Sequence, residues 1–373
     1  MIRLLAREWA RFVATPRLWW FTLLLPVMLP GLLLLIFSKQ VPDRLPVAAV
    51  DLDQSAVSRQ LLRALDSTPG LKITVNLPDL TAAASRVRQG EVYAVVVVPR
   101  DFARALIRAE QPRIQLYYNR QTLTAGNLVL REVRTAVTTT AIGLSVAQGV
   151  SPAVLLQSHA LFNPGLEFGR FLALPLAVAV LHVLMVVVAL DVTGRELRNG
   201  SAGEWLNAGG GGVVTALLGK LLPYMAWFVL SGLVILAAML RLLGIELDGS
   251  PGIWALGWLS LVLASFGLGA FLLGLFGNLR LATSVASVLV SPAFAYSGMT
   301  FPASAMDGFA AFWAQALPLT HFLHLQAAQV LMAAPPAAAL GSLGALLLCS
   351  LLPVLTLPRW RRWLTDPDSW GQA

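Results

Sequence analysis

Polar residues at spacings that suggest chemistry occur in a few places, and the first is Asp51-Leu-Asp53-Gln-Ser55 after an apolar run. This matches the aspartate nucleophile loop of magnesium-dependent phosphatases. That chemistry also needs a later lysine and an acidic pair to hold the metal. Lys72 is the only later lysine in this region, and no Asp-Asp or Asp-x3-Asp pair follows it. We therefore favour an acidic turn at a strand end, with Ser55 capping the next helix.

The stretch from Gly212 to Lys220 ends in Gly-Lys, as a phosphate-binding loop does. Such a loop needs Gly-x4-Gly-Lys-Ser/Thr, because its backbone N–H groups surround a phosphate and its hydroxyl binds magnesium. Here Val214 and Leu221 occupy the required glycine and hydroxyl positions. We predict that this chain binds no nucleotide itself.

Histidine and cysteine give no catalytic arrangement. His182 lies in the middle of an apolar run, where an ionisable group is by default a functional candidate. The alternative is a neutral histidine bonded to a neighbouring helix. His321 and His324 are one turn apart, with only a distant Asp307 as a third ligand, and the single Cys349 excludes an intrachain disulfide. The sequence predicts neither a metal site nor an enzyme.

Residues 191–220 form a polar, Gly-rich stretch between two apolar runs. It is long for a connection between adjacent helices, it has opposite charges next to each other, and it contains Trp205 with Leu206. The alternative is a solvated turn, but we favour a protein-docking role. The candidate docking residues are Arg195, Glu196, Arg198, Gly200, Ser201, Glu204 and Lys220.

The elements that position these residues belong to an integral membrane protein. Of the 373 residues, 57% are hydrophobic and only 12% are charged, against about 25% in soluble domains. The formal charge of +8 then indicates cytoplasmic loops and contact with lipid headgroups, not nucleic acid. The first apolar run follows a charged helix and has no cleavage site after it, so we interpret it as a retained helix.

The apolar runs predict an α-helical polytopic protein with six crossings. Residues 302–335 are apolar but too short between prolines to cross, which favours a re-entrant hairpin. Candidate residues there are Ser297, Gly298, Phe301, Pro302 and Pro318. The expected crossings are 18–38, 168–190, 213–240, 253–276, 281–300 and 337–357.

Two further parts have their own patterns. Residues 1–17 read as a basic interfacial helix, with Trp9 on the apolar face and Arg7 on the polar one. Residues 39–167 predict an α/β domain inserted between the first two crossings, because strands alternate with helices. We expect strands at 46–51, 71–75, 91–99 and 113–118 in a mostly parallel sheet, and a long helix at 122–148.

Basic residues set the expected orientation. The short segments on one side hold eleven and those on the other side hold only Arg241. Both termini, the coupling loop 191–219 and the tail 358–373 are therefore expected in the cytoplasm, with residues 39–167 outside. The eleven are Arg3, Arg7, Arg11, Arg17, Arg195, Arg198, Lys220, Arg280, Arg359, Arg361 and Arg362.

Over essentially its whole length the chain resembles permease subunits of type-2 ABC exporters, most closely the drug or antibiotic efflux branch. The shared motifs are Val50-Asp51-Leu-Asp53-Gln-Ser55, Val98-Pro99-Arg-Asp-Phe102, Arg195-Glu196 with Gly200-Ser201 and Leu206, Leu218-Gly219-Lys220, Ser297-Gly298-Met-Thr-Phe301-Pro302, and Leu317-Pro318-Leu-Thr320-His-Phe322. Two departures are Ser201, where the family has Thr, and Gly209 to Gly212, where a turn with proline is usual.

The resemblance implies a permease in a bacterial inner membrane that exports a small amphipathic or lipid-like molecule or drug. It implies a second permease subunit and a separate ATP-binding subunit that carries ATP and magnesium, with residues 191–219 as the coupling element. The outer domain would gate the exit or meet a periplasmic adaptor. The alternative from another class is a membrane-anchored sensor with an extracytoplasmic receptor domain.

Overall fold

The chain divides into two compact units, which are described separately. One comprises Met1–Ser38 and Glu167–Ala373, and the other Lys39–Leu166. The computed structural model describes residues 2–37, 44–89, 91–108, 110, 113–118, 123–147, 167–301, 306–332 and 334–371.

The second unit is an α/β structure whose described part contains a four-stranded sheet in the order β2-β1-β3-β4. β1 (Leu45–Asp51) pairs in parallel with β2 (Leu71–Asn76) and β3 (Ala94–Val98), as the sequence predicts. β4 (Gln115–Tyr118) is antiparallel to β3. Among the described residues, α6 (Phe102–Ile107) is the one helix between β3 and β4, and it is shorter than the crossover helices that usually join parallel strands.

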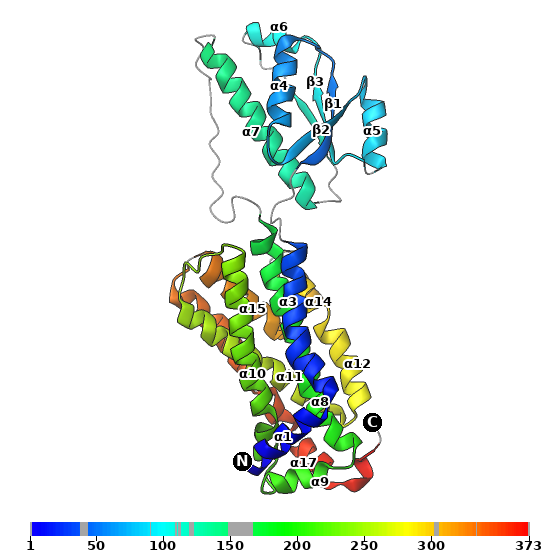
Figure 1. Cartoon of the computed structure of the whole chain (residues 1–373), viewed down its shortest axis with the longest axis vertical. Coiled ribbons are helices and arrows are strands. Elements are labelled where there is room, and N and C mark those ends of the chain that lie inside the picture. Colours follow the sequence, from blue (N-terminus) through cyan, green and yellow to red (C-terminus); the bar gives the residue numbers. More distant parts are fainter. Residues whose placement is uncertain are drawn as a thin grey trace. The chain divides into compact units, whose positions relative to one another are not determined.

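Helices cover both faces of this sheet (Figure 1). Alternate residues of β3 point to opposite faces, so Ala94, Val96 and Val98 belong to one core and Val95 and Val97 to the other. α4 (Ala56–Asp66) and α7 (Leu123–Ala147) cover the first face, and α5 (Leu80–Arg88) covers the second.

The acidic stretch after β1 builds a turn. Asp51 Oδ1 accepts from the backbone N–H groups of Asp53 and Gln54, and its Oδ2 accepts from the Ser58 hydroxyl at 2.7 Å. Ser55 caps α4 by accepting from the Ser58 N–H, which confirms its predicted capping role. Asp53 accepts from the Ala103 N–H at the start of α6. Both carboxylates therefore organise the loops at this edge of the sheet.

The first unit is a helical bundle, and its described residues include six helices long and apolar enough to cross a membrane. This confirms the number expected from the sequence. They are Pro16–Ile36 (α2 Pro16–Trp19, η1 Trp20–Leu24, α3 Leu25–Ile36), Gly169–Arg198 (η2 Gly169–Ala173, α8 Leu174–Arg198), Val213–Leu242 (α10), Pro251–Phe276 (α11), Leu279–Tyr296 (α12 Leu279–Val290, α13 Ala293–Tyr296) and Pro336–Thr365 (η5 Pro336–Ala339, α16 Leu340–Ser350, η6 Leu352–Thr356, α17 Leu357–Thr365).

α8 and α11 form the centre of this bundle, since most of each helix is buried while α3 and α16 are largely exposed. The two helices approach closely where Gly269 of α11 faces Ala189 and the Val186 carbonyl of α8. A β-carbon at Gly269 would lie 2.6 Å from that of Ala189. Glycine is thus required for this contact.

The polar stretch between the second and third crossings is mostly helical, not a loop. α8 continues to Arg198, α9 spans Ala202–Ala208, and α10 begins at Val213. Gly210 and Gly211 have φ angles of 73° and 80°, a left-handed conformation that glycine adopts without strain. Their N–H groups bond carbonyls of α9, so the glycine run is an ordered C-terminal cap and turn.

Candidate functional site

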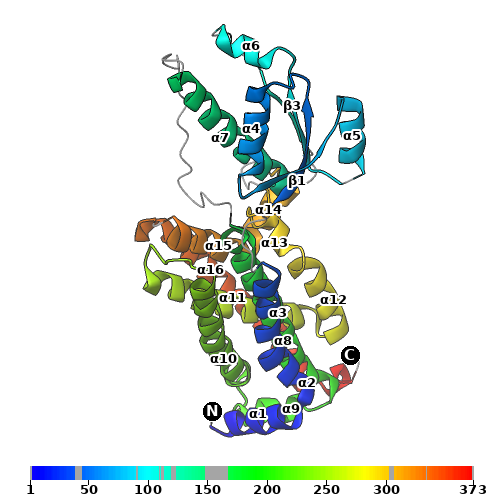
Figure 2. The same ribbon diagram turned by 45° about the horizontal axis from the view of Figure 1, so that its top comes forward.

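Helix α1 (Ile2–Ala14) lies beside α9 at the end of the bundle where α17 is also found (Figures 1 and 2). Leu4 and Glu8 are buried, whereas Trp9 is 69% and Val13 52% exposed. Arg7 and Arg11 of the predicted polar face turn inward towards α8. Both pair with the same carboxylate there.

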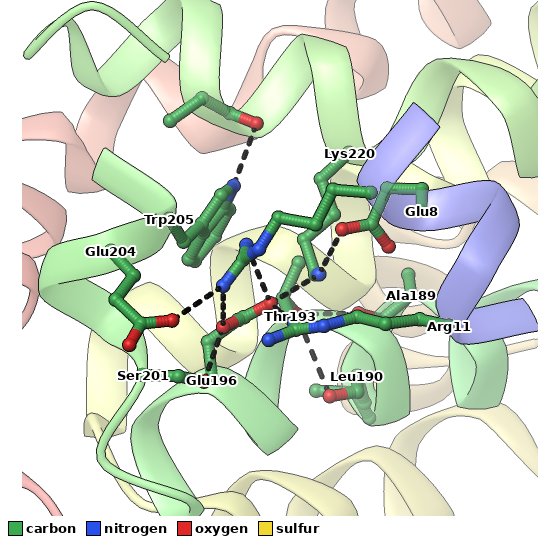
Figure 3. Close-up of polar contacts among 12 residues, drawn as sticks. Glu8, Arg11, Ala189, Leu190, Thr193, Glu196, Ser201, Glu204, Trp205 and Lys220 are labelled. Carbon is green, nitrogen blue, oxygen red and sulfur yellow. Dashed lines mark hydrogen bonds and ion pairs between the residues drawn. The ribbon is translucent and has the colours of Figure 1, made fainter. Parts of the chain in front are cut away.

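That carboxylate belongs to Glu196 near the C-terminal end of α8, and it is completely buried (Figure 3). Arg7 donates to both of its oxygens at 3.2 Å, which is the bidentate geometry that arginine favours. Arg11 donates to Oε1, as does Lys220 Nζ of α10 at 2.6 Å. The hydroxyl of Ser201, the residue before α9, donates to Oε2 at 2.5 Å. One side chain thus joins α1, α8, α10 and the start of α9.

Lys220 extends this network to α1. Its side chain is 2% exposed, and its ammonium group lies 2.8 Å from Glu8 Oε1 and stands over the Trp205 ring at 5.3 Å from the centroid. Trp205 of α9 is fully buried, donates from Nε1 to the Ala216 carbonyl of α10 at 3.0 Å, and packs edge-on against Trp360 of α17. The tryptophan of the predicted docking stretch therefore anchors α9 to α10 and α17.

We call Arg7, Glu8, Arg11, Glu196 and Lys220 the charge cluster. Three cations meet two buried carboxylates, and the exposed Glu204 lies 3.7 Å from Arg7. Burial and the neighbouring Arg7 lower the pKa of the Arg11 guanidinium, which nevertheless stays charged. Removing Glu196 would take an anionic partner from all three cations at once, and breaking a buried ionic contact in this way costs about 3–5 kcal/mol.

A second ionic group lies one turn earlier on α8. Asp191 is paired with Arg195, four residues later on the same helix, at 2.5 Å, and with Arg17 at the start of α2. The exposed fraction of the Arg195 side chain is 15%. This group ties the first crossing helix to α8, just as the charge cluster ties α1 to it.

The predicted docking residues separate into two sets. Glu196 and Lys220 are buried at this end of the bundle. Ser201 donates to Glu196, and Arg195 pairs with the buried Asp191. Arg198, Gly200 and Glu204 are exposed, and the Glu204 side chain retains 79% of its accessible surface. Together with the exposed Asn199 and Asn207, these three form a surface over the end of α8 and the outer side of α9, which we call the α9 face.

Residues 16–357 match the family described as ABC-2 family transporter protein. This match spans nearly the entire chain, including the first five apolar helices, most of the sixth and the stretch that holds Glu196 and Lys220. The chain belongs to the ABC-2 transporter family. A comparison with curated proteins gives no match.

Family membership defines the general role of the chain. It is a multi-pass membrane protein and a permease subunit, and permeases of this family work with an ABC ATP-binding subunit. The charge cluster lies at the end of the bundle that contains α1 and α9.

The remaining candidate residues of the permease lie elsewhere. His182 of α8 is fully buried and lies 2.7 Å from Ser265 of α11 through Nδ1. Since the Ser265 hydroxyl donates to the Leu261 carbonyl, it accepts from His182, and Nδ1 carries the proton. This hydrogen bond to a neighbouring helix is the second of the two interpretations that the sequence allows for His182. Within the described residues, no group of three His, Cys, Asp or Glu is placed to hold a metal.

The stretch expected as a re-entrant hairpin contains α14 (Gly308–Ala316), α15 (Pro318–Gln326) and η4 (Ala327–Leu331). Ser297 is buried and its hydroxyl donates to the Phe294 carbonyl, while Gly298 has a φ of 82°. Phe301 is 51% exposed, and Pro318 is buried at the start of α15. Pro302 lies outside the described residues.

Three members of the charge cluster were missed as site residues by sequence reasoning. The pattern places Arg7 and Arg11 on the polar face of an interfacial helix and gives Glu8 no role, and the partners of all three lie about two hundred residues away. One signal was available, because Glu8 is the only acidic residue among the first 42. A lone carboxylate in such a basic helix indicates a specific internal partner.

Proposed function

We propose that this permease exports a small amphipathic or lipid-like molecule or drug when an ABC ATP-binding subunit docks on the α9 face. The partner would carry ATP and magnesium, and a second permease subunit would complete the membrane channel. In this arrangement both termini and the α9 face are cytoplasmic, in a bacterial inner membrane. The second unit is then extracytoplasmic, where it gates the exit or meets an adaptor protein.

One observation carries the coupling proposal, namely the complete burial of Glu196 between four elements. A docking element transmits force only if it moves together with the crossing helices. Ser201 fixes the start of α9 to Glu196, Lys220 fixes α10, and Arg7 fixes α1. Because separating these charges is costly, the bundle end is expected to move as one body.

The α9 face supplies the other half of the proposal. Its charged groups Arg198 and Glu204 have opposite sign and are exposed at its surface. Exposed charges of this kind set the specificity and rate of association with a partner. Trp205 on the same helix is fully buried, so a force applied by a partner at this surface would reach a closely packed core.

The position of the face agrees with the expected orientation. The short segments at this end carry ten more basic residues than those at the other end, which favours the cytoplasmic side. An ATP-binding subunit is a cytoplasmic protein, so the docking face and the positive charge must lie on the same side.

Charge reversal on the α9 face tests the docking proposal. We expect Arg198→Glu with Glu204→Lys to lower the affinity for the ABC ATP-binding subunit by at least about tenfold, or 1.4 kcal/mol. Co-purification and permease-stimulated ATP hydrolysis measure this. Arg241→Glu is the matched control, since Arg241 is exposed at the opposite end of α10. Equal assembly and hydrolysis in both variants would show that docking occurs elsewhere.

A further inference from the structure

A cavity of about 550 Å³ lies between α1, η1 and α10, next to the charge cluster. Its walls are mainly aromatic and aliphatic, with Trp9 and Phe12 from α1, Leu23 from η1, and Tyr224 and Trp227 from α10. The volume is in the range of sites that bind small organic ligands. The walls match an apolar occupant.

Two walls of the cavity are joined by a hydrogen bond. In a regular helix the Thr22 carbonyl would accept from the N–H of residue 26, but that residue is Pro26, which has none. The Trp227 indole fills this role and donates to the Thr22 carbonyl at 2.6 Å. η1 and α10 are thereby fixed at this point, and the space beside them is part of the fold.

The cavity is continuous with the apolar outer surface of the permease. Three of its wall residues, Trp9, Leu23 and Trp227, are 69%, 37% and 42% exposed. Trp20 beside them is 55% exposed. Exposed tryptophans at the end of a crossing helix are typical of the membrane interface. What enters the cavity from this side is therefore lipid.

Polar side chains of α1, α2 and α10 indicate which polar headgroup the occupant has. The Tyr224 side chain is 5% exposed and its hydroxyl has no hydrogen-bond partner among the described residues. Arg11 of α1 and Arg17 of α2 lie on either side of the break at Thr15, and their side chains are 37% and 52% exposed. An arginine has five N–H donors, so both can bind a phosphate while keeping their carboxylate partners.

We propose that this cavity binds one acyl chain of an anionic phospholipid. The chain fills the apolar space, the Tyr224 hydroxyl donates to an ester oxygen, and the phosphate lies at Arg11 and Arg17. Since Glu8 also lines the cavity and holds Lys220, the bound lipid supports the contact between α1 and α10. The site depends on the membrane location of η1 and α10 but not on the docking proposal.

Native mass spectrometry of the full-length permease, exchanged into phosphatidylglycerol or phosphatidylcholine, tests the site. We expect the wild type to retain one phosphatidylglycerol molecule in preference to phosphatidylcholine. Leu23→Trp fills the cavity without breaking a polar contact and should abolish retention. Tyr224→Phe removes only the hydroxyl and should weaken binding about 3- to 10-fold, as expected for one hydrogen bond.

Leu32→Trp is the matched control, because Leu32 is 52% exposed on α3 and lies outside the cavity. It should retain phosphatidylglycerol like the wild type. Undiminished retention in Leu23→Trp, with a circular dichroism spectrum like that of the wild type, would overturn the site. Equal retention of phosphatidylcholine by the wild type would overturn the anionic headgroup.

Discussion

Glu196 and Glu204 lie eight residues apart in the same polar stretch but have opposite environments. Glu196 has no exposed surface and accepts from arginine, lysine and serine donors, while the Glu204 side chain is 79% exposed. Replacing a buried carboxylate that has three cationic partners by a neutral group takes an anionic partner from each of those cations. An exposed ion pair contributes little to stability, because water solvates the two charges almost as well when they are apart.

The same change at the two glutamates separates their roles. We expect Glu196→Gln to lower the free energy of unfolding by about 3–5 kcal/mol, since Arg7, Arg11 and Lys220 lose their shared anion. Glu204→Gln should change it by less than about 1 kcal/mol. Detergent-induced unfolding in mixed micelles, followed by tryptophan fluorescence, measures both. Similar losses for the two variants would contradict the assigned environments.

At the scale of elements, glycines allow helices to approach at some positions and are dispensable at others. Gly269 lies where α11 meets α8, with the Val186 carbonyl 3.0 Å from the place of its missing β-carbon. Gly344 lies on an exposed side of α16, with nothing within 4 Å. Both lie inside helices, so the intrinsic preference of helices for alanine is the same at each position.

Alanine at these two glycines is expected to act in opposite directions. Gly269→Ala forces α8 and α11 apart and should lower the free energy of unfolding by about 1–3 kcal/mol. Gly344→Ala meets open space and should raise it by up to about 1 kcal/mol through helix propensity. The same unfolding assay compares them. A neutral Gly269→Ala would show that the central helices do not pack at this distance.

At the scale of the whole molecule, the two units differ in the partners that they can reach. The bundle includes the α9 face, and the proposed orientation places that face in the cytoplasm with the α/β unit on the other side of the membrane. This follows from the asymmetry of basic residues, because the short segments at the α9 end hold eleven and those at the other end hold one.

Cysteine labelling tests this orientation directly. In a Cys349→Ser background, Lys72→Cys places a thiol in the α/β unit and Asn207→Cys places one on α9. A membrane-impermeant maleimide should label the first variant in intact spheroplasts and the second only after permeabilisation. The reverse pattern would invert the topology and remove the α9 face from the reach of an ATP-binding subunit.

The sequence by itself determined the class of the protein, the six crossing helices and the α/β unit. These depend on local quantities, namely the length of apolar runs and the alternation of strands and helices. Even the cap at Ser55 followed from neighbours in the chain. The antiparallel β4 did not, because its direction depends on how far the short α6 carries the chain.

Only the tertiary structure decided the composition of the functional site. Glu196 and Lys220 carry the same charges whether they face a partner protein or each other, and their burial is set by α1, which lies about 190 residues before Glu196. Trp205 likewise became an internal anchor through Trp360 of α17. Charge and hydrophobicity are properties of single residues, but desolvation is a property of the surroundings that the fold supplies.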